Sequence, residues 1–189
     1  MHPYDGGEKT PPADPTMTAA KDPAIRRKTG RAGHKTSAAR LAAVQALYEI
    51  DLTGADSAQV IDDFIDKRWR SVTLRDPDIT PGDGGTARLP NPNPEFLHAL
   101  VEGVDTNRQE IDALIEQTLD GDWTLERLDA LMRSLLRTTA FELRDMPNTP
   151  RLTILTEYSD LAHTFFDEKD ANFANGVLNK LAHNIRPES

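Results

Sequence analysis

The sequence contains no cysteine among its 189 residues. This absence excludes disulfide bonds, zinc sites with thiolate ligands and cysteine nucleophiles. No apolar run approaches the roughly 20 residues that a membrane-spanning helix needs, and the N-terminus lacks the apolar stretch of a secretory signal. We therefore expect a soluble cytoplasmic protein, and the chain is long enough to bury a real hydrophobic core.

The motifs of common catalytic sites are missing as well. The sequence has no glycine-rich phosphate loop, no G-x-S-x-G and no H-E-x-x-H, and its five histidines show no metal-ligand spacing. Asp76 and Asp78 suggest a calcium loop only faintly, because Pro81 stands where that loop needs its glycine. These absences predict a protein that is not an enzyme and that binds no cofactor or metal.

The net charge of −9 is unevenly distributed along the chain. Residues 1–40 hold eight basic and four acidic side chains, whereas the other 149 residues hold 14 basic and 27 acidic ones. Most of the basic excess lies in residues 25–40, which contain no acidic side chain. A basic arm on an acidic body is typical of nucleic-acid contact, but a solvated leader explains the charge equally well.

The chain divides into an arm and a body. Residues 1–34 are rich in proline, glycine, threonine and charge, which predicts a disordered basic arm. From Thr36, a candidate N-cap, apolar residues recur at helical spacing through a domain that spans residues 35–189. A long loop is predicted at 71–94, where prolines and glycines interrupt this pattern.

The body has the features of an all-α protein. Later helices are predicted to start at or beside Asn93, Thr106, Thr124, Thr149 and Asp170, each a candidate cap before an apolar stripe. No segment alternates apolar and polar residues for long enough to form a strand. We predict about seven helices and no sheet.

The segment from Phe173 to Leu181 gives two conflicting signals. Asn175-Gly176 is typical of a hairpin turn, yet Phe173, Val177 and Leu181 recur at the four-residue spacing of a helix. A glycine inside a helix costs about 1 kcal/mol relative to alanine. Gly176 could admit another helix or a nucleic-acid backbone at close range, and Phe173 could either cap the core or present a ring for stacking.

Four segments resemble the NusB family of bacterial antitermination factors, in the order in which that family carries them. They are ARLAAVQALYEIDL (39–52), LLRTTAFEL (135–143), LTEYSDLAHTFF (155–166) and FANGVLNKLA (173–182). The resemblance extends over nearly all of residues 36–187 and implies an all-α fold of two small packed bundles.

The resemblance also implies a function. Such proteins, with the ribosomal protein NusE, hold the boxA sequence of nascent ribosomal RNA transcripts, join the RNA polymerase elongation complex with other Nus factors and suppress premature termination. No catalysis and no cofactor are implied. Two alternatives remain: a helical interaction module that never binds RNA, and a relative of the helical domain that precedes ribosomal RNA methyltransferases.

The predicted RNA-binding residues lie in the arm, the first helix and the last helix. They are Arg26, Arg27, Lys28, Arg31, Arg40, Gln45, Tyr48, Lys169, Phe173 and Asn175. The family often carries arginines where Thr36, Ser37 and Ala38 stand, so here the charge lies further upstream. Lys169 occupies a position that is acidic in some members. Arg137, Glu142 and Glu157 are left out, because buried ion pairs between helices explain them about as well as a partner does.

Overall fold

The computed structural model describes residues 23–68 and 91–187. Within these ranges the chain forms seven α-helices, two short helical turns and no strand, which confirms the predicted all-α class. The elements are α1 (Pro23–Thr53), α2 (Ser57–Asp63), the π-helical turn η3 (Phe64–Arg68), α3 (Pro94–Thr106), α4 (Arg108–Glu116), the 3₁₀ turn η5 (Leu125–Arg127), α5 (Ala130–Asp145), α6 (Arg151–Phe165) and α7 (Glu168–Ile185). Most of the predicted 71–94 loop lies outside the described residues.

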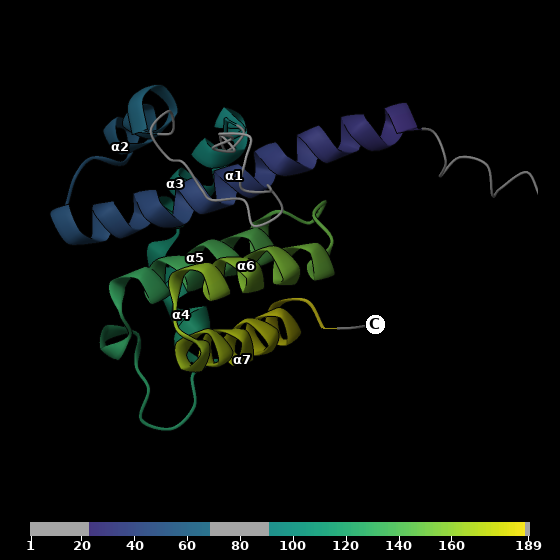
Figure 1. The fold of residues 1–189 in the computed structure, drawn as a ribbon. Coiled ribbons are helices and arrows are strands. Elements are labelled where there is room, and N and C mark those ends of the chain that lie inside the picture. The colour runs from purple at the N-terminus through teal and green to yellow at the C-terminus, as the bar shows by residue number, and fades with distance from the viewer. Residues whose placement is uncertain (1–22, 69–90, 188–189) are drawn as a thin grey trace, which may run out of the picture.

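The helices pack as two groups around α5. The first group is α1, α2 and α3, which contact one another. The second is α4, α6 and α7, each of which contacts α5. Helix α5 also contacts α1 and α3 of the first group. Every residue of α5 from Ser134 to Leu143 is buried. Figure 1 shows α1 above the α5–α6 pair and α7 below it. The core of α5 thus holds both groups together.

Helix α1 starts earlier than the sequence predicted. Thr36 is not its N-cap: the Thr36 and Ser37 hydroxyls donate to the Gly33 carbonyl at 2.8 and 3.0 Å, inside a helix that begins at Pro23. Hydroxyl side chains bond to a preceding turn as readily as they cap one. Residues 23–34 of the predicted disordered arm are therefore helical, and residues 1–22 lie outside the described residues.

Side-chain carboxylates and amides set most other helix starts. The predicted cap Asn93 is confirmed, since its side-chain oxygen accepts the Phe96 N–H at 3.1 Å ahead of Pro94. The predicted cap Thr124 precedes only the short turn η5 and makes no side-chain capping bond, and the predicted cap Asp170 is wrong. Asp129 caps α5 and Asp167 caps α7, each by accepting a backbone N–H, at 2.8 and 2.9 Å respectively. A sequence window offers several caps, and packing selects among them.

The predicted cap at Thr106 is also wrong. Thr106 is the last residue of α3, and the amide of Asn107 donates to the Gly103 carbonyl at 2.8 Å, closing that helix. Gly103 has a second role. A Cβ at this position would overlap the ring of the buried Phe141 on α5. The Phe141 ring of α5 therefore packs directly onto the backbone of α3 at Gly103.

Arg186 fixes the end of α7 to the end of α5. Its guanidinium donates to the carbonyls of Glu142 at 3.1 Å, Met146 at 2.8 Å and Thr149 at 2.8 Å, and also to that of Leu143. These carbonyls lie at the negative end of the α5 dipole, where a cation is favoured. The contact holds α7 in place for the site described below.

Asp51, near the end of α1, joins three helices. Its carboxylate accepts from Arg108 at 2.9 Å, Arg133 at 2.9 Å and Arg137 at 3.1 Å, on α4 and α5. Partial burial raises the pKa of Asp51, but the hydrogen bond from Arg133 and the charges of Arg137 and Arg133 outweigh it, so this pKa lies below its ordinary value. Arg137 also binds Asp112 at 2.7 Å, so the structure shows the ion pairs between helices that were one of the two explanations left open for this residue.

Asp51→Asn should reduce the free energy of unfolding at neutral pH by about 1–2 kcal/mol, because charged hydrogen bonds are lost at a partly exposed site. A lowered folded-state pKa stabilises the protein above the unfolded pKa of about 3.9 and ceases to do so as pH falls through the folded value. Wild-type and variant denaturation curves should therefore converge in acid. Asp105→Asn, which removes an exposed partner of Arg108, is the control and should change little at any pH.

Candidate nucleic-acid interface

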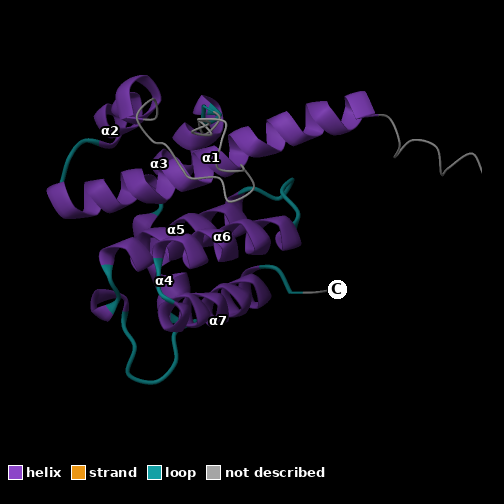
Figure 2. Cartoon of the chain, in the orientation of Figure 1, coloured by secondary structure: helices purple, strands orange, loops and turns teal. Residues whose placement is uncertain are grey.

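A groove of about 190 Å³ lies between α7 and the loop of residues 117–124. This loop leads from α4 to η5, and Figure 2 draws it in teal. It is lined by Thr118, Asp120, Trp123, Asn172, Phe173, Gly176, Val177 and Lys180. Gly121 allows the loop to turn, with a φ of +64° in the left-handed region that favours glycine. Two of the lining residues, Phe173 and Gly176, are the first and last residues of the FANG sequence at 173–176.

The groove answers the conflict at Asn175-Gly176. The segment is helical throughout, so the hairpin interpretation is wrong. A Cβ added at Gly176 would meet no heavy atom within 4 Å. No other described helix therefore approaches at this residue, and the prediction of a helix crossing there is wrong too. The missing side chain instead leaves the groove open at its centre.

Two aromatic rings form one wall. The Trp123 and Phe173 ring centroids lie 5.0 Å apart at an interplanar angle of 43°. The guanidinium carbon of Arg127 lies 5.7 Å from the Trp123 ring centroid. Phe173 is half-buried against the core, whereas Trp123 keeps 47% of its surface exposed. Phe173 thus packs partly against the core and leaves part of its ring surface exposed, and its stacking on a base stays a prediction.

Lysines stand at both ends of the same α7 face. Lys169 precedes Phe173 by one helical turn, and Lys180 follows Gly176 by another, so helical geometry places their Cα atoms about 16 Å apart along the axis. Both lysines are exposed, and Lys180 pairs with Asp120 across the groove mouth. The arrangement offers cations on either side of an aromatic surface.

Asn175 faces away from this groove. Its amide nitrogen lies 3.1 Å from Nε2 of His163 on α6, and its side-chain oxygen is buried without a hydrogen-bond partner. Residues two apart on a helix point in different directions, so Phe173 and Asn175 do not share a surface. The structure separates this predicted pair.

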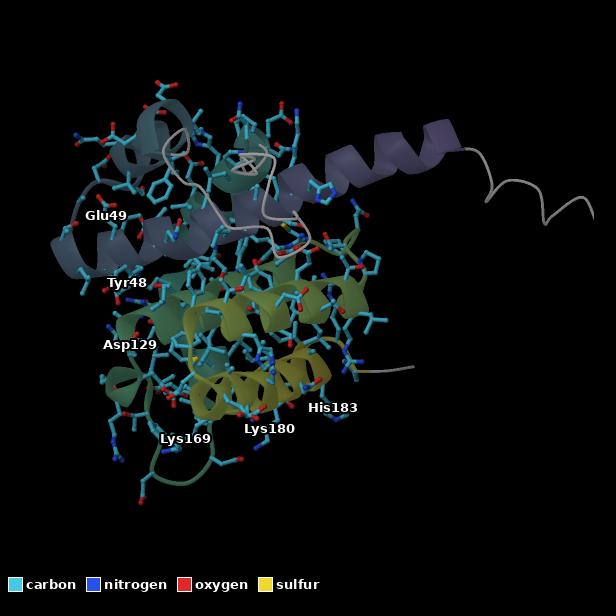
Figure 3. The ribbon with its side chains drawn as sticks, viewed as in Figure 1. Tyr48, Glu49, Asp129, Lys169, Lys180 and His183 are labelled. Carbon is cyan, nitrogen blue, oxygen red and sulfur yellow. The ribbon has the colours of Figure 1, made fainter. Side chains whose placement is uncertain are left out.

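Gln45 and Tyr48 lie on a different helix. Both are half-buried on α1. Figure 3 shows Tyr48 on α1 and Lys169 at the start of α7, with the α5–α6 layer between them. The predicted residues therefore form two surfaces, one on α1 and one on α7.

Arg40 lies inside the protein. Only 3% of it is exposed, and its guanidinium donates to both carboxylate oxygens of Glu142, at 2.9 and 2.6 Å. Glu157 lies 3.4 Å away on α6, and the Phe96 ring centroid is 5.2 Å from the guanidinium carbon. The structure thus gives Arg40 a role in tying α1 to α5 and α6, which corrects its prediction as a surface RNA contact.

Arg26, Arg27, Lys28 and Arg31 fall in the first turns of α1, whose side chains are not among those described. In Figure 1 this end of α1 extends past the other helices. Sequence analysis missed Trp123 and Lys180 as site residues. Trp123 lies just before a predicted helix start, and only the folded chain brings it against Phe173, which is 50 residues further along.

Comparison with known proteins identifies the family to which this chain is similar. A model described as the NusB family matches residues 37–183. The transcription antitermination protein NusB of Novosphingobium aromaticivorans is 37% identical over 154 residues, which cover 82% of this chain and 97% of that protein. The NusB of Brucella anthropi is 36% identical over 159 residues, covering 84% and 88%. The chain belongs to the NusB family.

A solved structure agrees with this membership at the level of the fold. It contains the antitermination factors NusB and NusE in complex with double-stranded RNA, and the matching chain has a TM-score of 0.61 and 24% sequence identity. The match covers 78% of this chain and 96% of that one. Among the described residues of this NusB-family chain, no helix is long and apolar enough to span a membrane, and no cluster of side chains is arranged to hold a metal ion.

Proposed function

We propose that this chain is a transcription antitermination factor that binds boxA RNA of ribosomal RNA operon transcripts together with NusE. In this role it joins RNA polymerase with the other Nus factors, prevents premature termination and acts by binding without catalysis. Such a factor works on nascent transcripts, hence in the cytoplasm. Family membership and the fold shared with a NusB–NusE–RNA complex support the proposal.

The observation that carries the RNA-binding part is the aromatic wall of the α7 groove between two lysines. Single-stranded RNA is held by bases that stack on aromatic rings and by cations that follow the backbone. Phe173 and Trp123 supply ring surface, and Lys169 and Lys180 lie on either side. The basic start of α1 would add contacts to phosphates further along the strand.

Phe173→Ala should weaken binding to boxA-like RNA by about tenfold or more, since a base stacked on a ring contributes roughly 1–3 kcal/mol. Because Phe173 is only half-buried, the free energy of unfolding should fall by about 1–2 kcal/mol, less than the 3–5 typical of a fully buried phenylalanine. Fluorescence anisotropy of labelled RNA, with and without NusE, measures the affinity, and thermal melts measure stability.

Phe165→Ala is the matched control, because Phe165 is also half-buried against the core but lies on α6, away from the groove. It should lose comparable stability and bind RNA normally. A wild-type chain that binds boxA-like and scrambled RNA equally weakly, even with NusE present, would contradict the proposal and favour an interaction module without RNA binding.

A further inference from the structure

The exposure of Trp123 has no explanation in the packing of the fold. It is one of three large hydrophobic side chains that the described residues leave exposed. Its ring is nevertheless held in place, by Phe173 at 5.0 Å and by Arg127 at 5.7 Å. A ring that is already positioned loses little conformational entropy when a ligand stacks on it. Trp123 therefore has the properties of a binding residue and not of a core residue.

The space beside this ring is kept free by Gly176. Nothing lies within 4 Å of the point where its Cβ would be. A glycine in an exposed helix interior lowers helix stability. No packing contact among the described residues requires a glycine at position 176. The groove floor is therefore helix backbone, open to a flat group entering between α7 and the loop.

The polar groups around the groove match the edge of a nucleobase. Asp120 offers acceptors, Lys180 offers donors, and the amide of Asn172 offers both. Base edges also carry both donors and acceptors. An arginine from a protein partner would bring donors alone and would meet the charge of Lys180. The acidic side chains of Asp120, Asp122 and Glu126 near Trp123 disfavour a contact made through phosphates only.

We propose that Trp123 and Gly176 form a site for one unstacked RNA base, which enters the groove against the indole ring while Lys180 contacts the adjoining phosphate. This inference rests on the proposed RNA-binding function and assigns to the groove a specific part of the RNA. Lys180 would exchange its pairing with Asp120 for the phosphate, so the ion pair opens when RNA binds.

The indole provides a direct readout. In a Trp69→Phe background, Trp123 is the single tryptophan of the chain. Titration with a short boxA-like oligoribonucleotide should quench its fluorescence, with the same midpoint as the anisotropy of labelled RNA. Trp123→Ala should weaken binding by about tenfold or more, and Trp123→Phe should retain most of the affinity because it keeps a ring for stacking.

Substitutions at Gly176 allow a test in which a loss of RNA affinity cannot be attributed to unfolding. Gly176→Ala should raise the melting temperature by about 2–4 °C, because a Cβ at this position meets no other atom, and Gly176→Leu should raise it as well, because leucine also favours helix over glycine. Alanine adds a single methyl group to the groove and should lower RNA affinity much less than leucine does. Leucine fills the groove and should lower affinity by about tenfold or more.

The outcomes separate this inference from the function on which it rests. If the wild type binds boxA-like RNA and neither Trp123→Ala nor Gly176→Leu alters the affinity, the base site is wrong and the proposed function stands. Unchanged RNA affinity with lost NusE binding in these variants would overturn the base site and assign the groove to a protein. A wild-type chain that binds no boxA-like RNA would overturn both proposals.

Discussion

Replacing Glu142 by alanine is expected to reduce the free energy of unfolding by about 3–5 kcal/mol, because the change leaves the Arg40 cation buried without its principal partner. Glu142 is fully buried and accepts from both Arg40 and the Tyr158 hydroxyl, the latter at 3.0 Å. Burial, and then the charge of Glu142, raises the pKa of Tyr158 well above its ordinary value, so the hydroxyl stays protonated and donates. Chemical denaturation followed by circular dichroism measures the loss.

Two further variants identify the cause of that loss. Glu157→Ala removes the more exposed carboxylate near Arg40 and should cost at most about 1 kcal/mol. The double change Arg40→Met with Glu142→Leu removes both charges and should be less destabilising than Glu142→Ala alone. A double variant that is no better than the single one would show that lost packing, and not an unpaired charge, is responsible.

Replacing Arg26, Arg27, Lys28 and Arg31 together by alanine should weaken RNA binding by about a hundredfold or more near 0.1 M salt, for boxA-like and scrambled sequences alike. Each phosphate contact that is lost should flatten the slope of log affinity against log salt by about 0.7 for single-stranded RNA. Alanine favours helix, so the start of α1 should remain folded. Titrations at several salt concentrations provide the slopes.

Arg144→Ala is the comparison for this change. Arg144 lies on α5, pairs with Glu110 and Asp145 and does not line the α7 groove. Its removal should leave affinity and salt slope unchanged. An unchanged slope in the four-residue variant would reduce the basic segment to a solvated leader, which the charge pattern alone also allowed.

The sequence was sufficient for the fold class because helical periodicity and stop signals are local. The apolar stripes and the breaks at Gly54, Gly121 and Pro147 are visible within a few residues. Helix starts were harder to predict. Thr36, Thr106 and Asp170 are each acceptable caps in isolation, but the structure begins those helices at other residues. Local chemistry offers several candidates, and tertiary packing selects one.

The site was predictable only in part, for a related reason. Phe173 stands in a recognisable motif, so it could be proposed from sequence. Trp123 joins the candidate site through its ring contact with Phe173, and helical spacing does not reveal which loop faces which side of α7. Arg40 shows the opposite case. A basic side chain beside a basic segment suggested a surface, but its partner Glu142 lies 102 residues away and takes it into the core.

The packing of the Phe141 ring onto Gly103 has an evolutionary consequence. A methyl group at position 103 overlaps the ring of Phe141, while the same methyl would favour the helix if the ring were absent. The effect of one replacement thus changes sign with the residue at the other position. A side chain at 103 is thus accepted at lower cost after position 141 has become smaller, so the order of the two mutations affects the stability of the intermediate.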